Sequence, residues 1–440
     1  SRVKNEKRQN RPIREGLTVK LQDLCPVPLP ENNLPEDIVI EPKALKDLVP
    51  LAKRHLGNHC VLLADPDTLS ACDGLNAPFE HLILPKKPMA DTETINQIIA
   101  QVPRGTHIVA LGGGTINDLA KRTSQLLDQP YIIAGTAASM NGYASGIAAI
   151  LDQGLKTTVP AAPPRAIILD TEILAQAPAA LAQAGLGDLI SKPVSDTDWW
   201  LAGQLGEADY SELPGKIVQH AMERATANPT EIRNRCPSAH GALGEALVLS
   251  GIAMVVAGSS SPASGGEHLI SHLWDMENII LQRPKHLHGA QVGVTTCISA
   301  AIYSLITEIE SPEWVSSVST SEERRRVRRD HPELAEIILG QALSKHSRST
   351  QRLQTLQDNW STILAGLRAR QIPKPDYFKQ LLKDAGAPCE LASFNHTRQD
   401  ARRTLSIAKD IRDRFTVLDL ATDLGLLPSH AELILQRAGL

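Results

Sequence analysis

Apolar residues in the first part of the chain come in short runs separated by segments of helical periodicity. Runs dominated by Val, Ile and Leu predict buried strands at residues 59–65, 81–85, 107–113, 131–137 and 165–170. Between these runs, residues 92–102 and 116–127 repeat their apolar positions every three to four residues and predict helices. Strands that alternate with helices favour a mostly parallel, Rossmann-like sheet covered by helices. Ligands of such sheets bind at the carboxyl ends of the strands.

The pattern changes after about residue 172, where strand signals stop. Apolar positions then recur at helical spacing, in residues 175–192, 241–258, 266–276, 288–306 and 400–425. We therefore expect an α/β nucleotide-binding domain over residues 36–172 and an all-α domain over residues 173–440, with the active site in the cleft between them. Residues 1–35 are predicted to form an N-terminal arm. No apolar run approaches the roughly 18 residues needed to span a bilayer.

Composition and charge narrow the class of partner. The 440 residues carry a formal net charge of −4 and only 3% are aromatic, so neither a nucleic acid nor a membrane is the expected partner. The arginine-rich run at residues 322–330 is more simply explained as a solvated helix. The six cysteines form no Cys-x-x-Cys pair, and residues 1–16 lack the apolar stretch of a secretory signal. We expect a cytoplasmic protein with reduced thiols.

A glycine-rich turn follows the third predicted strand. Gly112, Gly113 and Gly114 let the backbone approach a bulky anion, because they carry no Cβ. Thr115 is the predicted N-cap of the next helix, and Asp118 lies in its predicted first turn. The free N–H groups of such a turn are natural partners for a pyrophosphate. The alternative is a tight strand-to-helix turn that binds no ligand.

A second polar loop follows the strand predicted at residues 131–137. Its small hydroxyl residues, Thr136, Ser139 and Ser145, lie at the same end of the predicted sheet and are suited to line a cofactor channel. Asp65 ends another predicted strand, where a carboxylate would bind the ribose of an adenosine. For this residue an ordinary Asp-Pro turn is the alternative.

Three segments of the helical half place an acidic residue or a histidine at a helix start after a glycine-rich break. They contain Asp188, the pair His268 and His272, and His288. His268 and His272 are four residues apart, so both imidazoles project from one helix face. One Asp and two His form an oxygen–nitrogen set suited to zinc, iron, nickel or manganese, with positions left open for a substrate. Any one of the 14 histidines, taken alone, is more often a structural residue, which is the alternative here.

Five motifs, in chain order, resemble those of the glycerol-1-phosphate dehydrogenase family, part of the iron-containing alcohol dehydrogenase and dehydroquinate synthase superfamily. They are GGGTINDLAK (112–121), TAASMNGYAS (136–145), GLGDLISK (185–192), SGGEHLISH (264–272) and HGAQVGV (288–294). The segment IRDRFTVLDLATDLGLL (411–427) resembles the family's C-terminal helix signature. The matches run from about residue 40 to 430, so the resemblance covers nearly the whole chain.

The resemblance implies an NAD- or NADP-linked oxidoreductase that interconverts dihydroxyacetone phosphate and sn-glycerol 1-phosphate. It implies a divalent metal, usually zinc, bound by Asp188, His268 and His288. His272 would face the substrate, and the product oxygen would be protonated through this imidazole or a water chain. We also expect a homo-oligomer, a dimer or larger. The implied contacts of the nicotinamide cofactor are Gly114, Thr115, Asn117, Asp118, Thr136, Ser139 and Ser145.

One position departs from the family pattern. Asn141 stands where the family has an aspartate that is expected to contact the substrate. An amide keeps an acceptor oxygen, loses the charge and adds a donor, which would change substrate choice or weaken activity. Two alternatives therefore stand beside the dehydrogenase. One is a dehydroquinate synthase-like lyase or cyclase, which carries a Glu where this chain has Asp188, and the other is a regulatory homologue.

Overall fold

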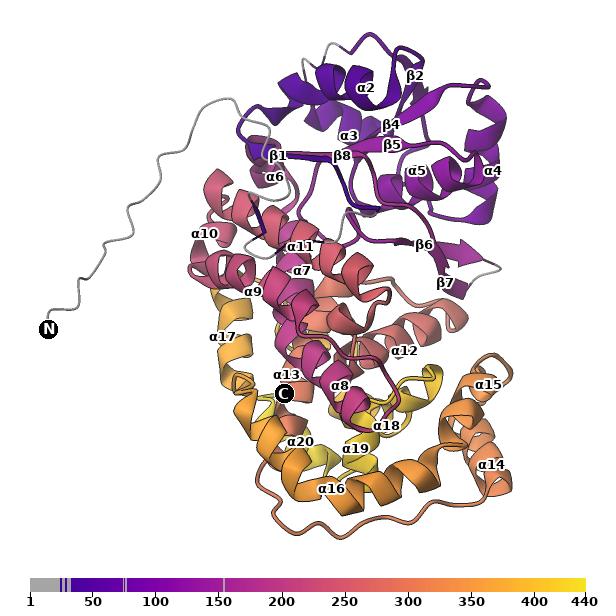
Figure 1. Ribbon diagram of the computed structural model, residues 1–440, viewed down its shortest axis with the longest axis vertical. Helices are drawn as coiled ribbons and strands as arrows, with labels where there is room; N and C mark the ends of the chain where they lie inside the picture. The colour runs from indigo at the N-terminus through magenta and orange to yellow at the C-terminus, as the bar shows by residue number, and fades with distance from the viewer. Residues whose placement is uncertain (1–23, 26–27, 30–32, 74, 76, 153–154) are drawn as a thin grey trace, which may run out of the picture.

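The first half of the chain is built on a parallel sheet. The computed structural model describes residues 24–25, 28–29, 33–73, 75, 77–152 and 155–440 (Figure 1). Six strands pair in the order β1-β8-β5-β4-β2-β3, and every neighbouring pair is parallel. This confirms the predicted α/β fold. The strands are β1 (Asp37–Glu41), β2 (Cys60–Ala64), β3 (Glu80–Ile83), β4 (His107–Gly112), β5 (Tyr131–Gly135) and β8 (Ala166–Asp170).

The two faces of this sheet belong to different hydrophobic cores. Leu62 and Ile132 point to one face, where they join a small core with the helix α2 (Leu48–Leu56). Leu63 and Ile133 point to the other face, which joins the main core of the protein. Because both faces are covered, these strands are apolar at successive positions, which is why their sequences are continuous hydrophobic runs. The other helices of this half are α3 (Pro66–Ala71), α4 (Thr92–Gln101) and α5 (Gly114–Leu126).

An antiparallel hairpin, which the sequence did not predict, follows β5. It consists of β6 (Ile147–Asp152) and β7 (Leu155–Pro160). Buried and partly exposed positions alternate along β6, as in a strand with one covered face. Apolar residues occupy both the buried and the partly exposed positions of this strand, so its sequence IAAILD shows no alternation of apolar and polar residues. The strand β1 was also not among the predicted runs.

The second half of the chain is helical, as predicted, and lies below the sheet in Figure 1. Among the described residues no strand follows Asp170. The helices are α6 (Thr171–Gln176), α7 (Ala179–Ile190), α8 (Lys192–Gln204), α9 (Leu213–Thr226), α10 (Pro229–Arg233), α11 (Pro237–Ala257), α12 (Gly266–Ile280), α13 (His288–Ile306), α14 (Thr320–Asp330), α15 (Ala335–His346), α16 (Ser349–Ala369), α17 (Pro375–Asp384), α18 (Arg398–Ile407), α19 (Val417–Asp423) and α20 (Ala431–Arg437).

Two of these helices correct the expectation about apolar runs. Both α11 and α13 are long and apolar enough to pass a membrane-span test by length and hydropathy. However, 72% of the most apolar window of α11 and 94% of that of α13 is buried inside the protein. They are therefore explained as core helices, and α13 packs against α7, α12, α17, α19 and α20.

The arginine-rich run forms α14, which is only partly the solvated helix that was predicted. Arg326 on this helix forks between two carboxylates, those of Glu323 and Asp410, with closest N–O distances of 2.7 Å to each. His331 Nε2 lies 2.9 Å from the same Asp410. The run therefore anchors its helix to the core through one arginine, while most of the other charges face solvent.

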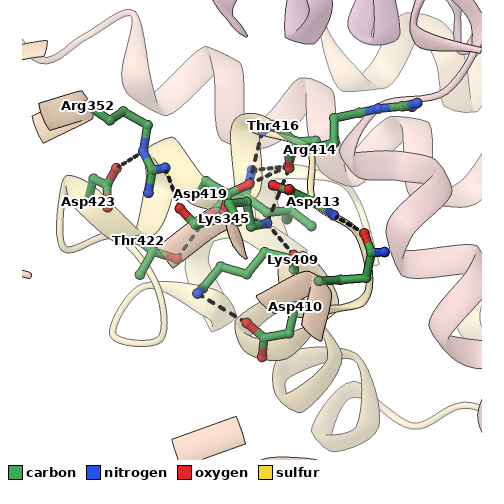
Figure 2. Close-up of polar contacts among 12 residues, drawn as sticks. Lys345, Arg352, Lys409, Asp410, Asp413, Arg414, Thr416, Asp419, Thr422 and Asp423 are labelled. Atoms are coloured by element: carbon green, nitrogen blue, oxygen red, sulfur yellow. Dashed lines mark hydrogen bonds and ion pairs between the residues drawn. The ribbon is translucent and has the colours of Figure 1, made fainter. Parts of the chain in front are cut away.

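A second buried ion pair joins α15 to α19 (Figure 2). Nζ of Lys345 lies 2.8 Å from Oδ1 of Asp419, and both side chains are almost fully buried. The same ammonium donates hydrogen bonds to the backbone carbonyls of Lys409 and Arg414. Asp419 also accepts hydrogen bonds from Thr416 at the start of α19. The ammonium thus satisfies three acceptors that have no access to water.

We predict that Lys345→Met destabilises the protein by about 3–5 kcal/mol, because it leaves the Asp419 carboxylate charged and uncompensated in the core. Urea-induced unfolding monitored by circular dichroism measures the change. Arg398→Met is the matched control: it breaks the exposed Arg398–Glu432 pair and should cost less than about 1 kcal/mol. Equal losses for the two variants would contradict a structural role for the buried pair.

Candidate active site

The four predicted metal and substrate side chains lie together. Asp188 comes from α7, His268 and His272 come from α12, and His288 is the first residue of α13. Oδ1 of Asp188 lies 3.5 Å from Nε2 of His268. The ring centroid of His288 lies 5.1 Å from that of each other histidine, and its ring stacks on that of His272. Three helices thus contribute to one site, and α7 is distant in the sequence from the consecutive helices α12 and α13.

Glycines allow the helices that carry Asp188 and His288 to touch along their backbones. A Cβ on Gly187 would lie 2.1 Å from the carbonyl oxygen of Gly289, and a Cβ on Gly289 would lie 2.0 Å from that of Ala184. No side chain fits in either place, because real Cβ atoms do not approach an oxygen so closely. The residue after Gly187 and the residue before Gly289 are the two predicted ligands. The glycines of both motifs therefore bring Asp188 and His288 together.

A buried carboxylate orients His268. Nδ1 of His268 lies 2.7 Å from Oε1 of Glu267, whose side chain is fully buried. Because a carboxylate only accepts hydrogen bonds, Nδ1 carries a proton. Nε2 faces the carboxylate of Asp188. Burial alone would lower the pKa of His268, but hydrogen bonds to Asp188 and Glu267 outweigh it and raise the pKa, so a bound cation would replace a proton on Nε2.

A neutral relay orients His288. The hydroxyl of Ser271 donates to Oε1 of Gln291 at 2.8 Å. The only proton of this hydroxyl is used in that bond, so the hydroxyl accepts a hydrogen bond from Nδ1 of His288, 3.2 Å away. The proton of the neutral ring is then on Nδ1, and Nε2 is unprotonated. The carboxylate of Asp275 lies 3.9 Å from the same Nδ1. In both histidines a hydrogen bond at Nδ1 thus leaves Nε2 as the nitrogen that could bind a metal.

The donor set fits a divalent metal in its chemistry. In a tetrahedral zinc site with bonds of about 2.0–2.1 Å, two ligand atoms lie roughly 3.3 Å apart, close to the 3.5 Å between Asp188 and His268. Within the described part of the chain, no three such side chains are already arranged at coordinating geometry. Nζ of Lys192 instead lies 3.3 Å from Oδ1 of Asp188. Burial alone would raise the pKa of Asp188, but the charge of Lys192 and the hydrogen bond with His268 outweigh it and hold the pKa well below its usual value.

A second buried carboxylate stands beside Glu267. Asp198 on α8 accepts hydrogen bonds from the N–H groups of Gly266 at 2.6 Å and Val417 at 2.8 Å, and from the hydroxyl of Tyr303. Burial and the nearby charge of Glu267 raise the pKa of Asp198 to about 8. Asp198 could not be identified as a site residue from the sequence, because none of its three hydrogen-bond partners is close to it along the chain.

The loop after β5 connects the sheet to this cluster. The N–H of Asn141 donates to Oδ2 of Asp188 at 3.2 Å, and its side-chain amide donates to Oγ of Ser250 on α11 at 3.4 Å. The loop can come this close because α7 carries Gly185, where a Cβ would lie 2.0 Å from the carbonyl oxygen of Ala138. Asn141 thus contacts a predicted metal ligand, and its contact with a substrate stays a prediction.

Lys121 clamps the same loop and was missed in the sequence. Its ammonium is buried and donates to the carbonyls of Gly142, Ser145 and Ile147 at 2.7–3.1 Å, and to Oγ of Ser145 at 3.1 Å. Burial lowers the pKa of Lys121 to about 8. The periodicity offered no signal for it, because Lys121 shares a face of the predicted helix with Asn117 and Ser124 and not with its apolar residues.

The glycine-rich turn differs in detail from the prediction. Gly113, not Thr115, is the N-cap of α5, and no side chain caps the helix. Thr115 lies inside the helix, and the first turn contains no acidic residue, so the expectation for Asp118 is also wrong. The helix begins earlier because Gly113 has an extended backbone that turns directly into Gly114. The helix start is therefore open to an anion, without a competing carboxylate in its first turn.

The remaining predicted cofactor residues fall into two groups. Ser139 is partly exposed and Thr115 is exposed. Asn117 and Ser145 are buried and bonded to the loop backbone, and Thr136 is buried as well. The side chain of Asp65 caps α3, as the turn alternative proposed. The cofactor contacts of all these residues stay predictions.

Comparison with known proteins agrees with the motifs. The family model for iron-containing alcohol dehydrogenase matches residues 39–178. The glycerol-1-phosphate dehydrogenase [NAD(P)+] of Bacillus subtilis is 28% identical over 418 residues, which cover 91% of this chain and 95% of that protein. The enzyme of the same name from Haloquadratum walsbyi is 34% identical over 280 residues, 63% of this chain and 74% of that one. A probable glycerol dehydrogenase from Sinorhizobium meliloti shares the fold, with a TM-score of 0.58 at 16% identity over 90% of this chain and 97% of that one.

We predict that Gly187→Ala forces α7 and α13 apart and separates Asp188 from His288. The expected result is a loss of about 1–3 kcal/mol in unfolding free energy and loss of bound divalent metal after dialysis. Gly340→Ala on α15 is the control, since a Cβ there meets nothing within 4 Å and alanine favours the helix by roughly 0.5–1 kcal/mol. If Gly187→Ala behaves like Gly340→Ala, the backbone contact is not needed for the site.

Proposed function

Because the chain belongs to the glycerol-1-phosphate dehydrogenase family, we propose that it interconverts dihydroxyacetone phosphate and sn-glycerol 1-phosphate with NAD or NADP as hydride carrier. The observation that carries the proposal is the cluster of Asp188, His268 and His288, in which Nδ1 of each imidazole has a hydrogen-bond partner and Nε2 of His268 lies 3.5 Å from the carboxylate of Asp188. The coarser statement, that the chain is an NAD(P)-dependent oxidoreductase of this family, rests on the relatives described above.

The metal would be held by Asp188 and by Nε2 of His268 and His288, with zinc the best match to this donor set. When bound, such an ion supplies Lewis-acid polarisation of the substrate carbonyl. The chain itself prepares these donors: Glu267 and the hydroxyl of Ser271 keep the proton of each imidazole on Nδ1. The metal in the cell, whether zinc, nickel, iron or manganese, is decided by metal analysis of the purified protein.

His272 is the proposed proton donor. Its ring stacks on that of His288 with an interplanar angle of 22° and lies on the same face of α12 as His268. In the reducing direction, hydride from NAD(P)H reaches the carbonyl carbon, and a proton from His272 completes the alcohol oxygen. An imidazole is suited to this task because it titrates near neutral pH.

The cofactor would bind at the carboxyl ends of β4 and β5. The open N-terminus of α5 offers backbone N–H groups to its pyrophosphate, since Gly113 leaves them uncapped. The adjacent loop, held by Lys121, would direct the nicotinamide toward Asn141 and the metal site. We also propose that the protein works as a cytoplasmic homo-oligomer.

A lyase or cyclase of the dehydroquinate synthase type is not proposed. The curated relatives quoted above are named dehydrogenases, and Asp188 occupies the place of that type's glutamate. A regulatory homologue without activity predicts no turnover, and the following assay separates it from the dehydrogenase.

We predict that zinc-loaded protein oxidises NADH or NADPH when dihydroxyacetone phosphate is added, as followed by absorbance at about 340 nm. His268→Ala should lower kcat/KM by at least about a thousandfold, since it removes a metal ligand. His220→Ala, at an exposed position on α9, should leave turnover unchanged. Absence of turnover with this and related keto-phosphates, in protein that binds both cofactor and metal, would sink the proposed function.

A further inference from the structure

The buried carboxylate of Glu267 lacks the partners that usually compensate a buried charge. Its Oε1 accepts two hydrogen bonds, from Nδ1 of His268 at 2.7 Å and from the N–H of Gly265 at 2.9 Å. Its Oε2 is buried and has no hydrogen-bond partner. Within the described residues, no lysine or arginine forms an ion pair with this carboxylate. A buried charge without a cationic partner destabilises a protein, so its presence calls for a reason other than stability.

The neighbouring carboxyl group of Asp198 further raises the free-energy cost of burying the Glu267 carboxylate. A Cβ built on Gly265 would lie 2.4 Å from Oδ2 of Asp198 and 2.9 Å from Oε2 of Glu267, so both oxygens flank the same point. Arg414 lies nearby, but its guanidinium donates to Ser264 and to Oγ of Ser260 rather than to either carboxylate. The two acidic side chains therefore face each other without a cation bonded between them.

A glutamine at position 267 would satisfy the same surroundings better. Its amide oxygen could accept the bonds from His268 and Gly265 that Oε1 accepts now. Its NH2 group would replace the unpartnered Oε2 and face Asp198 as a donor. Hydrogen bonding alone thus does not account for a carboxylate here. Glutamine would lack the negative charge, and the group on which this charge acts is the imidazole of His268.

We propose that Glu267 is a positioning residue that holds His268 with Nε2 toward Asp188 and, through its charge, makes that nitrogen a stronger donor for a divalent cation. An anionic acceptor on Nδ1–H raises the basicity of the opposite ring nitrogen. On its Nδ1 side, His288 has the neutral relay of Ser271 and Gln291 at hydrogen-bond distance, and the carboxylate of Asp275 lies farther away, at 3.9 Å. His268 is therefore the more tightly binding of the two histidines. The inference rests on the metal site of the proposed function, but not on its substrate.

The test compares Glu267→Gln with the wild type, using zinc and cobalt ions without substrate. In competition with a chromogenic chelator, Glu267→Gln should bind Zn²⁺ about 10–100-fold more weakly. The cobalt-loaded variant should show a shifted visible absorption band. The metal-free variant should be at least as thermally stable as the metal-free wild type, because glutamine removes the buried charge beside Asp198.

Glu207→Gln is the matched control. Glu207 is also a buried carboxylate, but it pairs with Arg352 and Arg348. This variant should lose thermal stability and keep the Zn²⁺ affinity of the wild type. Wild-type affinity in Glu267→Gln, or a loss of stability like that of Glu207→Gln, overturns the proposal. Failure of the wild type to bind Zn²⁺ overturns the metal site as well. If the wild type binds Zn²⁺ but does not reduce dihydroxyacetone phosphate, only the substrate assignment fails.

Discussion

Where α7 crosses α13, no side chain separates the two backbones, since Gly187 faces Gly289 and a Cβ on either would lie about 2 Å from a carbonyl oxygen. This contact determines the distance between Asp188, a predicted ligand, and His288 at the start of α13. It also makes α13 the buried axis of the helical half, with α12 packed beside it to bring in His268 and His272. The geometry of the site thus depends on this backbone contact between α7 and α13, which a single added methyl group would disturb.

The chain uses buried charge in two different ways. Away from the site, opposite charges are paired: Lys345 meets Asp419, and Arg326 meets Asp410 and Glu323. Such pairs hold α14, α15 and α19 in place. At the site, Glu267 and Asp198 crowd together without a bonded cation. Paired charges tend to maintain a fold, whereas neighbouring acidic side chains without a bonded cation indicate a site where stability is given up for chemistry.

The two halves of the molecule are linked through the loop after β5. Lys121 binds this loop from the sheet side with four hydrogen bonds, and the N–H of Asn141 reaches Asp188 from it. A ligand that rests on the glycine turn and a metal held by the helices would therefore meet across one rigid segment. This arrangement suits hydride transfer, which requires cofactor and substrate to be held in a definite relative orientation.

The sequence by itself determined the parallel sheet, the helical second half and the four side chains of the site, because continuous apolar runs, helical periodicity and the glycine-linked motifs are local signals. It could not decide what depends on distant partners. The clamp of the loop by Lys121 and the placement of Asp198 beside Glu267 both arise from contacts between remote segments. A lysine or an aspartate is the same residue in the sequence whether its side chain lies in water or in the core. Only the tertiary structure decides which of them loses its solvent, and that loss gives these residues their roles.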